Sequence, residues 1–88
     1  MEKFKSILRD SIKGGASEVH IVQAAPVVAH TKDGTRELAQ FGAVEADWLQ
    51  NMVKGLFAKD LAKIENGEPA LGELSISGVG KIILILEP

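Results

Sequence analysis

The sequence predicts an α+β domain in which two or three helices pack on an antiparallel sheet of about five strands. Apolar residues recur at helical spacing near the amino terminus and again in the middle of the chain. Apolar and polar residues alternate between these stretches and after them, as in strands with one buried face. Short connections such as Asp33-Gly34 join the alternating stretches and favour antiparallel hairpins. The expected order is therefore one helix, three strands, one or two helices, and two strands.

The first helix is expected over residues 2–13. Its apolar residues, from Phe4 to Ile12, fall on one face, and polar residues occupy the other. Gly14 and Gly15 end the helix, because glycine adopts the left-handed conformation that other residues avoid.

Three strands follow this helix. Val19 and Ile21 define the buried face of the first strand, and Pro26 marks a turn or the start of the second. Asp33-Gly34 suits a tight hairpin between the second and third strands. We expect these strands over the ranges 18–22, 27–32 and 35–39.

Gly42 is expected to break the chain before a broad apolar stripe that predicts a helix over 44–58. A shorter helix continues this stripe and ends near Asn66-Gly67. A fourth strand is expected over 73–77, where apolar and polar residues alternate again.

Gly78-Val79-Gly80 is expected to turn the chain into a fifth strand over 81–87. The run from Ile82 to Leu86 is apolar on both faces. Such a strand has to be central in the sheet, or covered by a helix or by another chain, because an exposed edge of this kind promotes aggregation.

The composition indicates one small domain, residues 1–88, with 45% hydrophobic and 25% charged residues. The chain has no cysteine, which is compatible with a reducing cytoplasm and excludes a thiolate metal site. A net charge of -2 gives no footprint for nucleic acid, and no apolar run approaches the length of a membrane helix. We expect a soluble, cytoplasmic protein without a cofactor, nucleic-acid partner or membrane insertion.

The residues that could form a catalytic or metal site do not complete one. His20 and His30 are the only histidines, and two ligands are too few for a tight zinc site. Ser17, Glu18 and His20 are the residue types of a nucleophilic triad, but their spacing does not orient a base toward a nucleophile. We expect Ser17 to cap a turn instead, so the chain is predicted not to be an enzyme.

Two other sequence patterns are not interpreted as functional sites: a possible phosphate-binding loop and a possible acid/base pair. Gly80-Lys81 lacks both the earlier glycine and the following Ser or Thr of a phosphate loop, because Ser75 and Ile82 stand there. Asp33 and Glu37 are expected on a solvated strand face rather than in an acid/base pair.

Short motifs along most of the chain resemble the PAS-like amino-terminal domain of the PilT/GspE-like family, the pilus-retraction and type II/IV secretion ATPases. The segment from Ala16 to His20 resembles that family's Ala-Ser-Asp-aliphatic-His string. Asp33-Gly34 and the stretch from Gly78 to Ile83 resemble its hairpin turn and its Gly-x-Gly-Arg-Phe-Arg stretch, in the same order. The resemblance implies a PAS-like fold in a bacterial type IV pilus or type II secretion context.

The departures from this family bear on function. The resemblance implies arginines that reach nucleotide phosphates or neighbouring subunits, but Lys81 and Ile83 stand at the two arginine positions of the glycine-rich stretch. No Walker motif is present, so ATP hydrolysis is not expected of this chain.

We therefore expect a non-catalytic protein-interaction or regulatory module. It would form a homodimer, or bind a larger motor or signalling protein, through Ile83 and Ile85 of the last strand or through Trp48. Core packing is the competing explanation for Trp48. The alternatives are an excised fragment of a full ATPase, or a PAS-like sensor of a small ligand. The residues available for ligand or polar contacts are Ser17, Glu18, His20, Gln23, His30 and Lys81.

Overall fold

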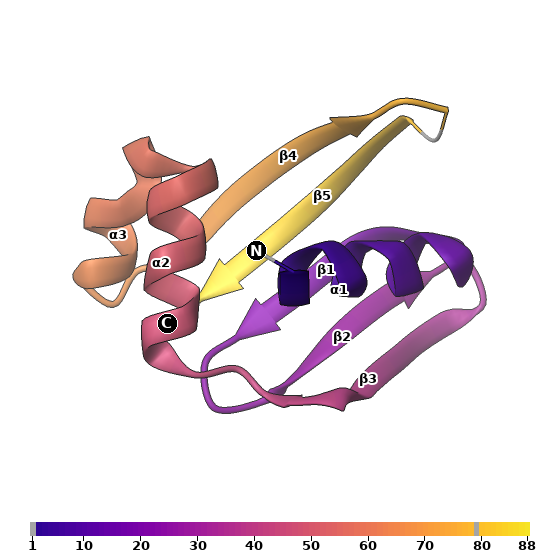
Figure 1. The fold of residues 1–88 in the computed structure, drawn as a ribbon, viewed down its shortest axis with the longest axis horizontal. Helices are drawn as coiled ribbons and strands as arrows, with labels where there is room; N and C mark the ends of the chain where they lie inside the picture. The colour runs from indigo at the N-terminus through magenta and orange to yellow at the C-terminus, as the bar shows by residue number, and fades with distance from the viewer. Residues whose placement is uncertain (1, 79) are drawn as a thin grey trace.

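The computed structural model describes residues 2–78 and 80–88 and shows an α+β domain, as the sequence predicts (Figure 1). A five-stranded sheet carries α1 and α2 on one of its faces. The elements are α1 (Glu2–Lys13), β1 (Ala16–Val22), β2 (Pro26–Thr31), β3 (Gly34–Ala43), α2 (Ala46–Leu56), a 3-10 turn (Ala58–Asp60), α3 (Leu61–Glu65), β4 (Ala70–Ile76) and β5 (Gly80–Glu87).

The sheet has the strand order β3-β2-β1-β5-β4. The pairs β1–β2, β2–β3 and β4–β5 are antiparallel, but β1 and β5 pair in parallel, so the expectation of an antiparallel sheet is wrong for this one pair. The hairpin argument applies only to strands joined by a short turn, whereas all the elements from β2 to β4 separate these two in the chain. The apolar fifth strand was expected to be central, or covered by a helix or by another chain, and the structure shows it in a central place, between β1 and β4.

The third strand is longer than expected, because Gly42 bends it without ending it. Leu38 lies opposite Val27, whereas Ala43 lies opposite the neighbouring Pro26, so β3 contains a bulge between these positions. Gly42 has a φ of 72°, a conformation that glycine adopts without strain.

Two further strand boundaries also differ from the expectation. The hairpin loop is Lys32-Asp33, and Gly34 already pairs with Thr31. The Thr31 hydroxyl accepts a hydrogen bond from the amide of Asp33 at 3.2 Å and donates one to the carbonyl of Gly34 at 3.1 Å. β4 begins at Ala70, before the expected start at 73, because a buried Ala70 and Gly72 continue the alternation.

The first helix has the expected bounds, and Gly15 ends it with a φ of 82°. Phe4 and Ile7 are buried beneath it, together with one polar residue, Ser11. The Ser11 hydroxyl donates to the carbonyl of Ile7 at 2.7 Å, so this small side chain faces the core without an unpaired polar atom.

The second helical region contains two helices, as expected, but the first is shorter than the expected range 44–58. α2 ends at Leu56, since Phe57 has a φ of -134° and a ψ of 52°, which are not helical. The shorter helix, α3, ends just before Asn66-Gly67, as predicted. The expected turn at Gly78-Val79-Gly80 includes Val79, which lies outside the described residues.

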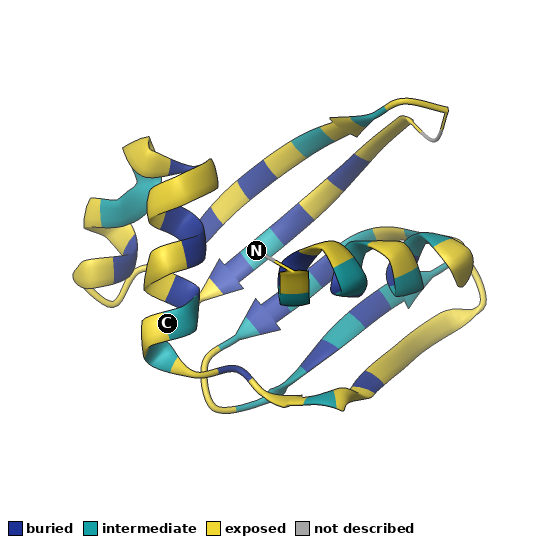
Figure 2. Cartoon of the chain, viewed as in Figure 1, coloured by how far each residue is buried: buried dark blue, intermediate teal, exposed yellow. Residues whose placement is uncertain are grey.

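The core lies between the sheet and the two longer helices. Buried and exposed residues alternate along β4 and β5, as expected for strands with one covered face (Figure 2). The strand residues buried on that face include Val19, Ile21, Val27, Leu38, Ile82, Leu84 and Leu86. Across the described residues, no helix combines the length and the apolar character needed to cross a membrane.

Candidate interaction surface on the open sheet face

The face of the sheet opposite α1 and α2 brings together most of the residues that the sequence analysis selected. We call this surface the open face. Its side chains alternate along each strand with the buried ones, and they are exposed or half-buried. The strand register places them in two rows that cross the sheet from β3 to β4. One row is Thr35, His30, Glu18, Ile83 and Glu73, and the next is Glu37, Val28, His20, Ile85 and Leu71.

Apolar side chains occupy the half of the open face formed by β4 and β5. Leu71 is 68% exposed and Ile83 is 37% exposed, and both are large hydrophobic residues. Ile85 lies directly opposite Leu71 and is half-buried. Single exposed apolar residues are ordinary, but a group on adjacent positions of one sheet face marks a surface suited to a partner.

The two histidines meet in the middle of the open face. Their rings are stacked, with centroids 4.0 Å apart and an angle of 28° between the planes. His20 Nε2 lies 2.6 Å from Glu18 Oε1, and the two side chains are 26% and 36% exposed. We call Glu18, His20 and His30 the histidine–glutamate cluster. Its geometry is reached because Glu18 and His30 are cross-strand neighbours and His20 follows Glu18 by two residues.

This cluster does not provide the donor set of a metal site. Among residues 2–78 and 80–88, no group of three or more His, Cys, Asp or Glu side chains is arranged to hold a metal ion. The Glu18 carboxylate fixes the orientation of the His20 ring, and the stack limits that of His30. These contacts therefore restrict the side-chain conformations of His20 and His30 at the centre of the open face.

The charged residues of the open face are mostly acidic. Glu37 lies on the edge strand β3, Glu73 lies on the opposite edge strand β4, and Glu87 lies near the end of β5. Lys81 is 71% exposed, and its Nζ lies 3.0 Å from Glu73 Oε1. This pair is solvent-exposed, so it contributes little to stability.

Ser17 does not cap a turn, contrary to the expectation from the sequence. It lies within β1, where the pairing with β2 is irregular between Ala16 and Glu18. The strand starts as soon as Gly15 has reversed the chain, which leaves no separate turn for Ser17 to cap. His20 contacts Glu18 as a base contacts its orienting acid, but among the described residues no hydrogen bond joins Ser17 to His20, so the nucleophile–base contact of a triad is missing.

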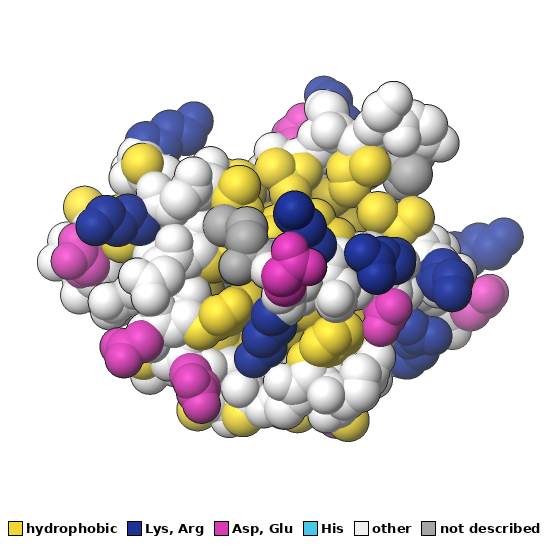
Figure 3. All heavy atoms as spheres, in the orientation of Figure 1, with side chains coloured by type: hydrophobic (Ala, Val, Ile, Leu, Met, Phe, Trp, Pro, Cys, Tyr) yellow, Lys and Arg dark blue, Asp and Glu magenta, His cyan; other side chains and the backbone are white. Residues whose placement is uncertain are grey.

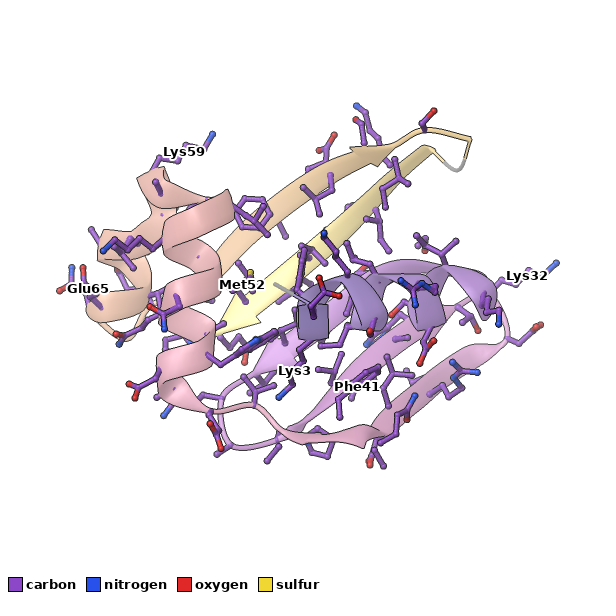
Figure 4. All side chains as sticks on the ribbon, in the orientation of Figure 1. Lys3, Lys32, Phe41, Met52, Lys59 and Glu65 are labelled. Atoms are coloured by element: carbon purple, nitrogen blue, oxygen red, sulfur yellow. The ribbon has the colours of Figure 1, made fainter. Side chains whose placement is uncertain are left out.

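Trp48 lies on the other side of the molecule, where it packs partly buried against the core. With Phe4, Asn51 and Met52 it lines a pocket of about 80 Å³ between α1 and α2. Lys3 Nζ lies 5.0 Å from the centre of the tryptophan ring, and Figure 4 shows Lys3 and Met52 at this junction of the two helices. The pocket is smaller than the ~300–1,000 Å³ of typical ligand sites.

The polar residues available for a ligand sensor do not lie between the sheet and the helices. His20 and His30 are on the open face, and Gln23 is exposed in the connection after β1. Ser11 is the buried polar residue of the described core, and its hydroxyl is already bonded.

Two residues outside the sequence-based selection prove important to this arrangement. Leu71 completes the apolar part of the open face, and its alternation with Ala70 and Gly72 was the signal for it. Arg36 holds β3 to the end of α1: its Nη2 donates to the carbonyl of Asp10 at 3.2 Å. No local pattern indicates a contact between residues so far apart in the chain.

Comparison of the chain with family models, with curated proteins and with solved structures found no match. The resemblance to the secretion-ATPase domain rests on the sequence motifs alone.

Proposed function

We propose that this chain is a non-catalytic protein-interaction module that binds its partner through the open face. The observation that carries the proposal is the exposure of Leu71 and Ile83, beside a half-buried Ile85, on a sheet face opposite the helices. Covering such side chains with a partner releases water from apolar surface, at about 25 cal/mol for each Å² buried. The stacked histidines next to them keep this surface pre-arranged, which lowers the cost of ordering it on binding.

The motifs add a context to this surface. We propose that the module is related to the amino-terminal domain of type IV pilus and type II secretion motor ATPases, with a PAS-like fold. The partner is then a motor or regulatory protein of such a system. A cytoplasmic location is part of this proposal and agrees with the absence of cysteine.

A regulatory role is favoured over catalysis by the residues themselves. Ser75 and Ile82 replace essential positions of a phosphate loop around Gly80-Lys81. In the histidine–glutamate cluster His20 contacts the carboxylate of Glu18, and Ser17 lies where the pairing of β1 with β2 is irregular. We expect the chain alone neither to hydrolyse ATP nor to bind it tightly.

The proposal is tested by comparing Ile83→Lys with Leu56→Lys. Ile83 and Leu56 are matched in exposure, at 37% and 39%, but Leu56 lies at the end of α2 and away from the open face. The wild-type chain and both variants are used as bait in a lysate of the native cell, and retained proteins are identified by mass spectrometry.

We expect the Ile83→Lys substitution to abolish retention of the specific partner and the Leu56→Lys substitution to preserve it. Light scattering at high micromolar concentration is measured in parallel, because a homodimer through β5 would dissociate in Ile83→Lys alone. Equal retention by the wild-type chain and Ile83→Lys, with no change in mass, would refute the open face as the binding surface.

A further inference from the structure

Charge is distributed unevenly between the open face and the rest of the molecule. The open face carries four carboxylates, Glu18, Glu37, Glu73 and Glu87, against the single ammonium of Lys81. Its formal charge of -3 exceeds the net charge of -2 of the whole chain, so the remaining surface is slightly positive. Figure 3 shows Lys and Arg side chains along α1 on the helix-bearing face.

The carboxylates surround the apolar residues of the open face. Glu37 and Glu73 lie on the two edge strands, at opposite ends of the cross-strand rows. Ile83 and Ile85 lie between them on β5. An occupant that covers the isoleucines therefore places its own flanks against carboxylates on both sides.

From this arrangement we infer that the open face binds a basic amphipathic segment of a partner protein. Apolar side chains of that segment cover Leu71, Ile83 and Ile85, and its Lys or Arg side chains pair with Glu37 and Glu73. This inference rests on the proposed function and specifies the chemistry of the partner at that same surface.

Size agrees with a short helix as the occupant. Five strands spaced about 4.8 Å apart make the open face about 19 Å wide between its edge strands. A helix of about 14 residues is about 21 Å long and spans that width. Its Lys and Arg side chains can extend along the sheet to the carboxylates while their aliphatic parts remain over apolar residues.

A second copy of the chain is a poorer occupant of the open face. A two-fold contact between two open faces would bring four carboxylates against four others, and like charges at an interface oppose association. Nucleic acid and anionic lipid are disfavoured for the same reason, since both would bring phosphates to an acidic surface.

The probe for this inference is a synthetic 14-residue peptide of Leu and Lys, with Leu at helical spacing. Its control is the same peptide with Glu in place of every Lys. Binding to the full chain is measured by fluorescence anisotropy at low ionic strength and in 0.5 M salt, and the site is located by amide chemical shifts. We expect the Lys peptide to bind with shifts across the strands of the open face, including β3 at Glu37 and β4 at Glu73, a loss of affinity of at least tenfold in high salt, and no binding of the Glu peptide.

Charge-reversal variants distinguish binding at the open face from a general electrostatic attraction between the peptide and the chain. The double variant Glu37→Lys/Glu73→Lys is expected to bind the Lys peptide at least tenfold more weakly. The matched variant Glu2→Lys/Glu65→Lys makes the same change in net charge at exposed positions of α1 and α3, and it is expected to retain wild-type affinity. Circular dichroism and thermal melting verify that each variant folds.

The outcomes distinguish this inference from the proposed function. Equal binding of the two peptides would overturn the basic segment as occupant. Shifts confined to α1 and α2, or equal losses in the Glu2→Lys/Glu65→Lys and Glu37→Lys/Glu73→Lys variants, would overturn it as well. Self-association of the wild-type chain that Ile83→Lys abolishes would overturn it too, while retaining the open face as an interface. If Ile83→Lys also leaves lysate capture unchanged, the proposed function fails as well.

Discussion

The ring of Phe57 lies directly over Gly72, so the backbone of β4 approaches the end of α2 at a point where no side chain fits. A Cβ atom at position 72 would lie 2.7 Å from Cζ of that ring. Phe57 is only 8% exposed, and the ring is part of the core. Glycine at position 72 therefore allows the second helical region to pack on the edge of the sheet.

We expect Gly72→Ala to lower the free energy of unfolding by about 1–3 kcal/mol, because the added methyl forces Phe57 out of its position. The measurement is urea denaturation followed by circular dichroism. The control is Leu71→Ala, which changes an exposed neighbour and should cost much less. Phe57→Leu should recover part of the loss when combined with Gly72→Ala, and a loss unaffected by Phe57→Leu would contradict this steric explanation.

Ala24 has a φ of 68° in the connection between β1 and β2, a region that residues with a Cβ adopt at a cost. Its amide donates to the carbonyl of Val44 at 2.8 Å, which fixes the conformation. We expect Ala24→Gly to raise the free energy of unfolding by about 0.5–1 kcal/mol, since glycine adopts this conformation without that cost. Ala39→Gly, at an exposed position of β3, should lower stability instead. A decrease for both variants, measured by thermal melting, would be incompatible with strain at position 24.

Arg36 links the third strand to the carboxyl end of α1. Its Nη2 donates to the carbonyl of Asp10, and the guanidinium also lies over Gly14. A cation at this end of a helix interacts favourably with the unpaired carbonyl groups. We expect Arg36→Ala to cost about 0.5–1.5 kcal/mol of unfolding free energy. Arg9→Ala, on the exposed side of α1, is the control and should be nearly neutral. Equal effects of the two substitutions in urea denaturation would argue against the link.

The stack of His20 and His30 predicts an energetic coupling between the two residues. A double-mutant cycle of His20→Ala and His30→Ala should give an interaction energy of about 0.5–1 kcal/mol at neutral pH, as for other cross-strand aromatic pairs. The free energies of unfolding of the four proteins provide the measurement. Additive effects of the two substitutions would mean that the contact between the two rings does not contribute to the free energy of unfolding. His30→Phe, which retains a ring of similar size, should preserve most of the stability lost in His30→Ala.

Local patterns predict much of this fold because they reflect local physical causes. The spacing from Phe4 to Ile12 gives α1 its bounds, and the left-handed conformation of Gly15 ends it. The two-faced apolar run of β5 predicts a strand that is central or covered, and β5 is central, with β1 and β4 on its two edges. Gly42 is harder to interpret, since the same residue can end a strand or bend it, and here it bends β3.

The open face is harder to predict from the sequence than the helices and strands are, because it depends on contacts between residues that lie far apart in the chain. Alternation predicts that His20 faces away from Val19 and Ile21, but the position of His30 against it depends on the register between β1 and β2. A shift of one residue in that register would turn every side chain of one strand to the other face. Leu71 reaches Ile85 only through the pairing of β4 with β5, and the parallel contact of β1 with β5 joins the two halves of the face.

That parallel contact also governs the order in which the chain can acquire its structure during synthesis. The hairpins β1–β2, β2–β3 and β4–β5 join neighbouring segments of the chain. The pairing of β1 with β5, by contrast, joins residues such as Glu18 and Ile83 that are separated by most of the sequence. A nascent chain that has not yet reached β5 can pair β1 with β2 but leaves the other edge of β1 open. The β1–β2–β3 segment therefore exposes a sheet edge to other chains until β5 has been synthesised and paired with it.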